Sequence, residues 1–163
     1  MRFFEDIQVG EETDLGAHRF TREEIVAFAA QWDPQGFHLE DDAAERGPFG
    51  ALTASGWHTA CVWMRLYVDR LLASRAARED AGQPVPRFGA SPGFRDLEWR
   101  RPVYVDDTVS FSSRVVDKRL LNSQPEWGLV ISRNEGINQR GELAYAFTGQ
   151  VFVERRQGAT SAG

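Results

Sequence analysis

The fold is decided by residues 29–59, AAQWDPQGFHLEDDAAERGPFGALTASGWHT, which join the end of one helix to the start of a second, longer one. Asp33 ends the first helix, because Pro34 disfavours the helical conformation in the residue before it. Ser55 or Thr53 is suited to cap the second helix, and Gly56 lets another backbone or a ligand approach its first turn closely. The stretch therefore predicts a bent loop held between two helix ends.

This loop carries an acid and a histidine five positions apart, Asp33 and His38. We expect the two side chains to converge, because the helix passes into a bent turn between them. The free amides at the start of the second helix, with Gly56 as the candidate donor, favour a partial negative charge. Together these groups suit the movement of a proton or a water molecule beside an activated carbonyl. An acid at a helix end followed by a turn histidine is also common for structural reasons, so that alternative stays open.

The flanking segments predict three helices. Residues 21–24 form a capping box, and Ile25, Phe28, Ala29 and Trp32 follow as one apolar stripe that we expect to face a core. Residues 39–45 predict a short helix. Residues 51–73 carry a long helical pattern with apolar residues on more than one face, which indicates a helix that is wrapped by other elements.

The rest of the chain reads as extended segments and turns. We expect an extended N-terminal segment at 3–9, a first strand at 12–20 with a bulge or close approach at Gly16, and a fraying helix end followed by a connecting loop at 75–85. Further strands are predicted at Phe88–Phe94, Leu97–Trp99, Thr108–Leu121, Gly128–Asn138 and Leu143–Glu154. Helices followed by alternating strands predict an α+β fold in which an antiparallel sheet packs on the long helix. We assign residues 1–154 to one domain and expect a disordered tail at 155–163.

Composition excludes several classes of protein. Cys61 is the single cysteine, so an internal disulfide is impossible and a reducing compartment is expected. The net charge of -5 argues against a nucleic-acid partner, which favours basic surfaces. The sequence shows neither a signal peptide in its first twenty residues nor an apolar run of the ~20 residues that a membrane span requires. We therefore expect a soluble cytoplasmic protein.

The acid and histidine resemble the signature of the MaoC-like dehydratases, a family that includes the (R)-specific enoyl-CoA hydratases. That signature has an Asp, then Asn-Pro two and three positions later, then an apolar residue and a His five positions after the Asp. Asp33, Phe37 and His38 keep this pattern, and Asp41 and Ala43 match the acid and small residue that follow.

Three further segments extend the resemblance over nearly the whole chain. Residues 49–50 and 54–59 resemble the segment that leads into the central helix of the family. Residues 94–108, FRDLEWRRPVYVDDT, resemble its following strand, Arg-Pro turn and next strand start. The chain departs from the family at residues 34–36, where Pro-Gln-Gly replaces the usual Xaa-Asn-Pro.

The resemblance implies the hotdog fold, in which an antiparallel sheet wraps a long central helix. It also implies that water is added or removed across the 2,3-double bond of an enoyl-CoA type thioester. Asp33 would act as base or orient the water, His38 would transfer a proton, and the Gly56 amide would stabilise the thioester oxygen. No metal or resident cofactor is implied, since the CoA or acyl-carrier pantetheine is part of the substrate. The family forms dimers by continuing one sheet into another, so at least a homodimer is expected.

Several other side chains are candidates for contact with the substrate. Helix capping and packing explain Ser55 and Thr59 equally well, whereas side chains such as Trp57, Phe37 and Phe49 are more often part of a core than of an acyl pocket. His58 is expected to serve packing. Candidate partners for the phosphates of a pantetheine carrier are Arg95, Arg100 and Arg101, with Arg114, Lys118 and Arg119 as further candidates. A solvated strand face is the more usual explanation of any one of them.

Two other functions remain open at this stage. A hotdog thioesterase would polarise the same carbonyl, but its acid usually lies on the long helix, where this chain offers only the distant Asp69. In a non-catalytic acyl-binding module, Asp33 and His38 would serve only the fold. A paired acid and histidine in an open cleft would favour an enzyme over such a module.

Overall fold

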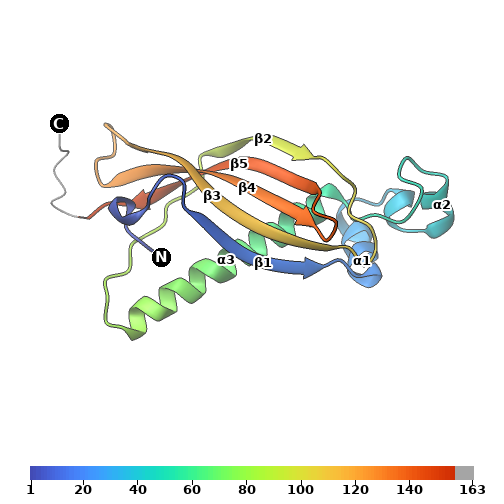
Figure 1. Ribbon diagram of the computed structural model, residues 1–163, viewed down its shortest axis with the longest axis horizontal. Coiled ribbons are helices and arrows are strands. Elements are labelled where there is room, and N and C mark those ends of the chain that lie inside the picture. The colour runs from blue at the N-terminus through green and yellow to red at the C-terminus, as the bar shows by residue number, and fades with distance from the viewer. Residues whose placement is uncertain (157–163) are drawn as a thin grey trace.

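The computed structural model describes residues 1–156, which form one five-stranded antiparallel sheet with a long helix against one face (Figure 1). The strand order is β1-β3-β4-β5-β2. The strands are β1 (Glu12–Arg19), β2 (Gly93–Trp99), β3 (Thr108–Leu120), β4 (Trp127–Asn138) and β5 (Leu143–Glu154). The helices are α1 (Arg22–Trp32), α2 (Asp41–Glu45) and α3 (Gly56–Asp80), with single 3-10 turns at Phe4–Asp6 and Gly36–His38. This is the α+β arrangement that the sequence predicts.

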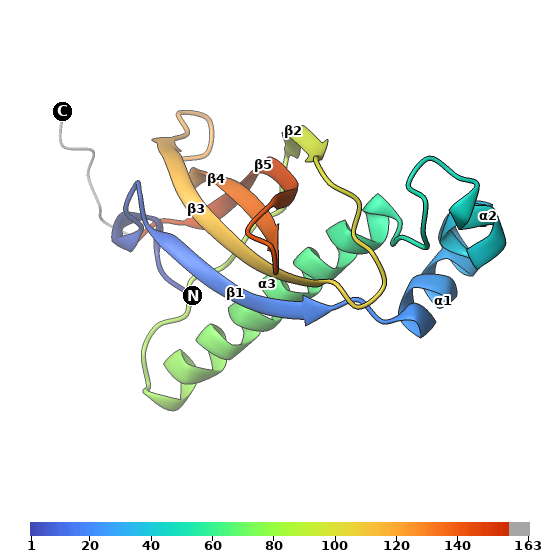
Figure 2. The same ribbon diagram turned by 45° about the vertical axis from the view of Figure 1, so that its right-hand side comes forward.

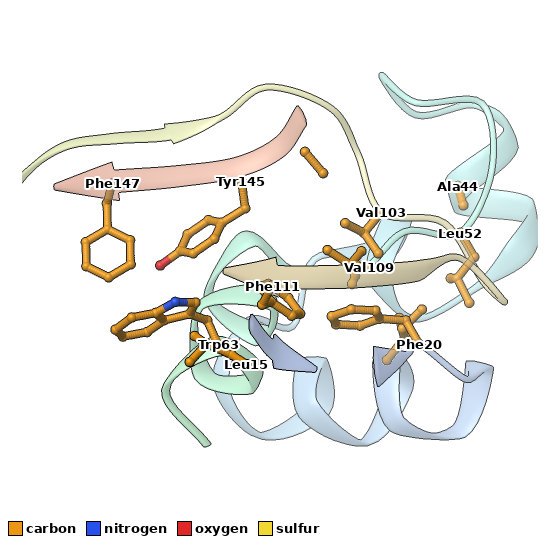
Figure 3. Packing of buried hydrophobic residues seen from close by; sticks show 13 residues of the cluster. Leu15, Phe20, Ala44, Leu52, Trp63, Val103, Val109, Phe111, Tyr145 and Phe147 are labelled. Carbon is orange, nitrogen blue, oxygen red and sulfur yellow. The ribbon is translucent and has the colours of Figure 1, made fainter. Parts of the chain in front are cut away.

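The main core lies between the sheet and the first half of α3 (Figure 3). Trp63 of α3 is buried there, and its ring meets Phe147 of β5 edge-on with the centroids 4.6 Å apart. Phe111 and Val109 of β3 fill the neighbouring space and are almost fully buried. Burial of such side chains contributes roughly 1.5–3 kcal/mol each, so the first turns of α3 are held firmly against the sheet.

Helix α1 confirms its sequence signals at both ends. The Thr21 hydroxyl accepts a hydrogen bond from the Glu24 amide, and the Glu24 carboxylate accepts one from the Thr21 amide. Asp33 follows directly as the C-terminal cap. The predicted apolar stripe is only partly buried, because Trp32 at its end is 67% exposed.

The long helix begins and ends later than the sequence predicts. Residues 51–54 are extended rather than helical, since Ala54 donates its amide to the Val103 carbonyl and Thr53 pairs with Tyr104. Ser55 is the cap, and its hydroxyl accepts from the Trp57 amide. Of the segment 75–85, expected as a fraying helix end and a loop, residues as far as Asp80 belong to the helix, because alanine and arginine are good helix formers.

Strand β2 replaces the two strands expected at 88–94 and 97–99. Phe88 makes only an isolated bridge to β5, and the strand starts at Gly93. A bulge between Arg95 and Glu98, with Asp96 at φ 53°, interrupts its pairing to β5. A second bulge, at Gly16 of β1 with φ 101°, is where the sequence predicts one.

Both chain ends of the described region are tied to the sheet. The N-terminal segment expected to be extended contains a 3-10 turn, and Lys118 of β3 donates to the carbonyls of Phe4 and Ile7. The disordered tail predicted from residue 155 is wrong for its first two residues, since Arg155 pairs with Glu5 and Arg156 with Asp6. Residues 157–163 of that predicted tail lie outside the described residues.

One side of α3 is not covered by the sheet. Figures 1 and 2 show the sheet over one side of the helix and the second half of α3 running beyond it. Large apolar side chains are exposed along its free side, namely Trp57, Met64, Val68 and Leu72. Among residues 1–156, no helix is long and apolar enough to cross a membrane.

His58 is a titratable group buried in the first turn of α3. Its ring stacks on Phe28 with centroids 4.7 Å apart and meets Phe20 edge-on at 5.2 Å. The residue is 7% exposed, and its Nδ1 has no hydrogen-bond partner among the described residues. Burial lowers the pKa of His58 from 6.5 to about 4. The imidazole is therefore neutral in the folded protein at pH 7, which agrees with the packing role expected for it.

Acidification should destabilise the protein through His58. Between pH 6.5 and pH 4 the unfolded chain binds a proton that the folded ring does not, so the free energy of unfolding falls as the pH falls. The full effect is about 3 kcal/mol. Urea unfolding of wild type and His58→Leu at pH 7 and pH 4.5 measures it: the variant should lose less stability on acidification. Equal losses in the two proteins would contradict the assignment.

Candidate functional site

The sequence-predicted site residues line one cleft of about 430 Å³ between the start of α3, the loop after α1 and the segment after β2. All of them contribute to its wall: Asp33, Phe37, His38, Phe49, Ser55, Gly56, Trp57 and Thr59. The cleft also includes residues that the sequence reasoning did not single out as site residues: Gln35, Thr53, Trp99, Val103 and Ala144. Residues far apart in sequence thus meet where α3 begins.

His38 has a fixed orientation at the floor of this cleft. Its Nδ1 lies 2.7 Å from the Thr53 carbonyl oxygen, and the residue is only 5% exposed. Since a carbonyl only accepts, Nδ1 carries a proton and donates it to Thr53. In the neutral imidazole, Nε2 is therefore the unprotonated nitrogen, and it lies 3.5 Å from Oδ2 of Asp33.

Asp33 is ionised beside this histidine. Burial alone would raise its pKa, but hydrogen bonds from the side chains of Ser55 and Gln35 and the charge of His38 outweigh burial, so the pKa of Asp33 lies below its usual value. Its side chain is 21% exposed, which leaves the carboxylate open to the cleft. When the His38 ring is neutral, its Nε2 and Oδ2 of Asp33 present two neighbouring hydrogen-bond acceptors to the cleft.

Gln35 stands in the loop where the sequence departs from the family pattern. Its Nε2 donates to Oδ1 of Asp33 at 2.8 Å, so one carboxylate oxygen is held away from His38 and the other faces it. Two backbone hydrogen bonds close the loop. The Gln35 amide donates to the Asp33 carbonyl, and the His38 amide donates to the Gln35 carbonyl. The replacement of the usual asparagine therefore supplies a direct partner for the acid.

The start of α3 forms another part of the cleft wall, beside Asp33. Ser55 is fully buried as the cap, and Thr59 is buried one turn later. The Gly56 amide makes no hydrogen bond with any other part of the described chain, as expected for the first residue of a helix. The positive end of the helix dipole therefore points an unpaired donor at the cleft.

Aromatic rings frame the cleft. Phe37 meets His38 at 4.4 Å and Phe49 at 5.6 Å between centroids, both edge-on. Trp57 meets Trp99 edge-on at 5.3 Å, and both indoles are about half exposed. The cleft therefore has a largely apolar wall around its acceptor pair.

The arginines with a predicted phosphate role separate into two groups. Arg100 and Arg101 lie at the rim of the cleft and pair with Glu98 and Glu142. The others lie elsewhere on β2 and β3: Arg95, Arg114, Lys118 and Arg119. The structure thus brings two of these six cations to the cleft.

The missed residues gave little signal in the sequence. Thr53 acts through its carbonyl, which every residue has, and Trp99 reaches the cleft from a strand more than forty positions away. Gln35 was the exception, because the departure from the family pattern marked its position. Within residues 1–156, no group of three or more His, Cys, Asp and Glu side chains is placed to hold a metal ion.

Comparison with known proteins gives consistent matches. The family model described as MaoC like domain matches residues 6–131. A MaoC-like dehydratase from Rhodospirillum rubrum is 34% identical with a TM-score of 0.80, over 96% of this chain and 99% of that one. The mesaconyl-CoA hydratase of Cereibacter sphaeroides is 31% identical over 107 residues, which are 63% of this chain but only 30% of that protein.

A more distant structure identifies the fold. A conserved hypothetical protein from Mycobacterium tuberculosis, described as a double hotdog fold, superposes with a TM-score of 0.69 at 18% identity, over 99% of this chain and 46% of that one. The central helix against an antiparallel sheet is the shared feature. The chain belongs to the MaoC-like domain family and has the hotdog fold.

Proposed function

We propose that this protein is a hydratase or dehydratase that adds water to, or removes it from, the 2,3-double bond of an enoyl-CoA type thioester. The observation that carries the proposal is the pair of side chains 3.5 Å apart, Oδ2 of Asp33 and Nε2 of His38, in the cleft that Gly56 also lines. A water molecule bound in the cleft can lie within hydrogen-bond reach of both side chains and donate to either of them.

The proposed reaction uses this water as the nucleophile. Its oxygen bonds to the β-carbon while Asp33 and His38 take up one of its protons, and the electrons of the double bond move toward the thioester carbonyl. The Gly56 amide stabilises the oxygen that gains negative charge. The proton then passes to the α-carbon, with His38 as its donor, so that one water is added overall. The reverse sequence eliminates water, and no step requires a resident metal or cofactor.

The relatives support this reaction class. The R. rubrum protein is described as a dehydratase, and the C. sphaeroides relative as a hydratase of a CoA thioester. A thioesterase is less well supported, because Asp69 of α3 pairs with Arg65 at 2.8 Å and does not line the cleft. The open, paired carboxylate of Asp33 likewise favours an enzyme over a binding module.

We propose CoA, or the equivalent carrier arm, as the carrier of the acyl group. Arg100 and Arg101 stand at the cleft rim, where guanidinium groups suit phosphate oxygens. The reaction would take place in the cytoplasm, which suits the exposed thiol of Cys61.

We further propose a homodimer. Strand β2 is an edge of the sheet, with Phe94 58% exposed on it, and α3 leaves its apolar side uncovered. A second copy that pairs at β2 and packs against α3 would remove both the unpaired edge and the apolar surface from water. The start of α3 lies beside β2, so each cleft would border this interface.

Substitution of the acceptor pair should abolish turnover. Asp33→Asn and His38→Ala should each lower kcat for trans-2-enoyl-CoA thioesters by about 10²- to 10⁴-fold, because general acid-base catalysis is lost. Loss of the enoyl thioester absorbance measures the rate. Asp42→Asn, an exposed acid on α2, is the matched control and should keep the wild-type rate. Release of free CoA by the wild type would establish the thioesterase instead.

Removal of the Gln35 amide should alter the pH profile. Gln35→Met takes away the donor to Oδ1, so the pKa of Asp33 rises and the acidic limb of the kcat profile moves to higher pH. Loss of this bond also frees the carboxylate to turn away from His38, so kcat should fall by roughly tenfold. A profile that coincides with that of the wild type would argue against this role of Gln35.

The dimer is testable by mass. Light scattering during size-exclusion chromatography should give twice the 18.4 kDa of one chain. Met64→Glu places a charge on the uncovered side of α3 and should shift the mass toward the monomer, whereas Arg46→Glu on another surface should not. A wild-type protein that elutes as a monomer at micromolar concentration would overturn the proposal.

A further inference from the structure

Trp99 covers the first residue of α3 with the nitrogen-bearing edge of its indole. A Cβ built on Gly56 would lie 2.5 Å from Cε2 and 2.6 Å from Nε1 of Trp99. Both distances are shorter than those that real Cβ atoms make with other heavy atoms, so only glycine fits beneath the ring in this position. The close approach of the indole therefore requires glycine at position 56. The backbone does not require it, because Gly56 has a helical conformation that any residue can adopt.

The indole nitrogen and the Gly56 amide are close enough to bind the same atom. Two bonds of about 1.5 Å separate a Cβ from its backbone nitrogen, so Nε1 of Trp99 lies within about 5.6 Å of the Gly56 nitrogen. Two N–H groups that donate to one oxygen at 2.9 Å lie no more than about 5.8 Å apart. Convergence on one oxygen in the cleft is thus geometrically allowed.

Both nitrogens are donors with no partner in the described chain. An indole N–H only donates, and Nε1 of Trp99 makes no hydrogen bond with any of residues 1–156. Trp99 lines the cleft and is 46% exposed. A cleft lined by these two unpaired donors and by Asp33 and His38 is suited to a carbonyl oxygen and a water molecule.

The bulge in β2 places Trp99 on this side of the sheet. Phe94 contacts Phe147, which packs on Trp63 of α3, so Phe94 faces the helix. Side chains alternate along a strand, so Trp99, five positions later, would face away without an irregularity. The bulge between Arg95 and Glu98 adds one residue to the strand, so the side chain of Trp99 lies on the helix side of the sheet. Pairing of Trp99 with Tyr145 of β5 then fixes its backbone.

We propose that Nε1–H of Trp99 donates a second hydrogen bond, beside the Gly56 amide, to the thioester carbonyl oxygen as it gains negative charge. The inference rests on the proposed hydratase function and adds a catalytic residue to it. Trp99 exchanges no proton with the substrate, so the proton balance of water addition is unchanged. Donors of this kind contribute about 10²- to 10³-fold to kcat when they are fixed in place before the reaction.

The test removes the N–H and keeps the ring. Trp99→Phe retains an aromatic ring near Gly56, and benzothienylalanine at position 99 keeps the indole shape with sulfur in place of N–H. Each should lower kcat by about 10²-fold with KM changed less than about threefold, because the bond strengthens mainly in the transition state. Trp32→Phe, on the exposed end of α1, is the matched control and should keep wild-type kcat.

A spectroscopic readout separates this role from packing. The carbonyl stretch of a bound enoyl thioester, measured by Raman difference spectroscopy, should lie at lower frequency in the wild type than in the benzothienylalanine variant, because the second donor polarises the carbonyl. The inference is overturned if this variant retains wild-type kcat and carbonyl frequency while Asp33→Asn remains inactive. If the wild type itself turns over no enoyl thioester, the proposed function fails and this inference fails with it.

Discussion

The hydrogen bond from His38 to the Thr53 carbonyl joins the two halves of the site. It fixes the loop after α1 to the segment that leads into α3. That segment is held in turn by a hydrogen bond from the Ala54 amide to the Val103 carbonyl. Because the histidine is buried, this bond forms out of water and sets both the ring orientation and the position of its proton. The spacing between the acceptor pair and the helix start depends on it.

The charge distribution around the cleft follows from the same arrangement. The chain is acidic overall, yet the cleft has the unpaired N–H groups of Gly56 and Trp99 in its lining and arginines at its rim. The ionised Asp33 is balanced locally by hydrogen bonds from two neutral side chains. An anionic substrate would thus meet local donors rather than a basic surface, and binding would depend on short-range contacts more than on long-range attraction.

Much of the site could be predicted from the sequence because its signals are local. The capping box, the proline after Asp33, the acid-histidine spacing and the serine before Gly56 each act within a few residues, and the structure has them where predicted. The sequence prediction ended α3 too early and divided β2 into two strands. The polar residues after Ser74 and the bulge at Asp96 leave no clear hydrophobic pattern in the sequence. Trp99 was missed because its contact with Gly56 is made only by the folded sheet.

The contact between Gly56 and Trp99 also limits how the sequence can change. A methyl group at position 56 has no space while the indole is present, and a smaller ring at position 99 would open a void above the helix start. Substitution at either position alone therefore meets a steric or a packing penalty. We expect the two residues to change together among related sequences. Their identities would then indicate how closely the central helix and the edge strand approach each other in each relative.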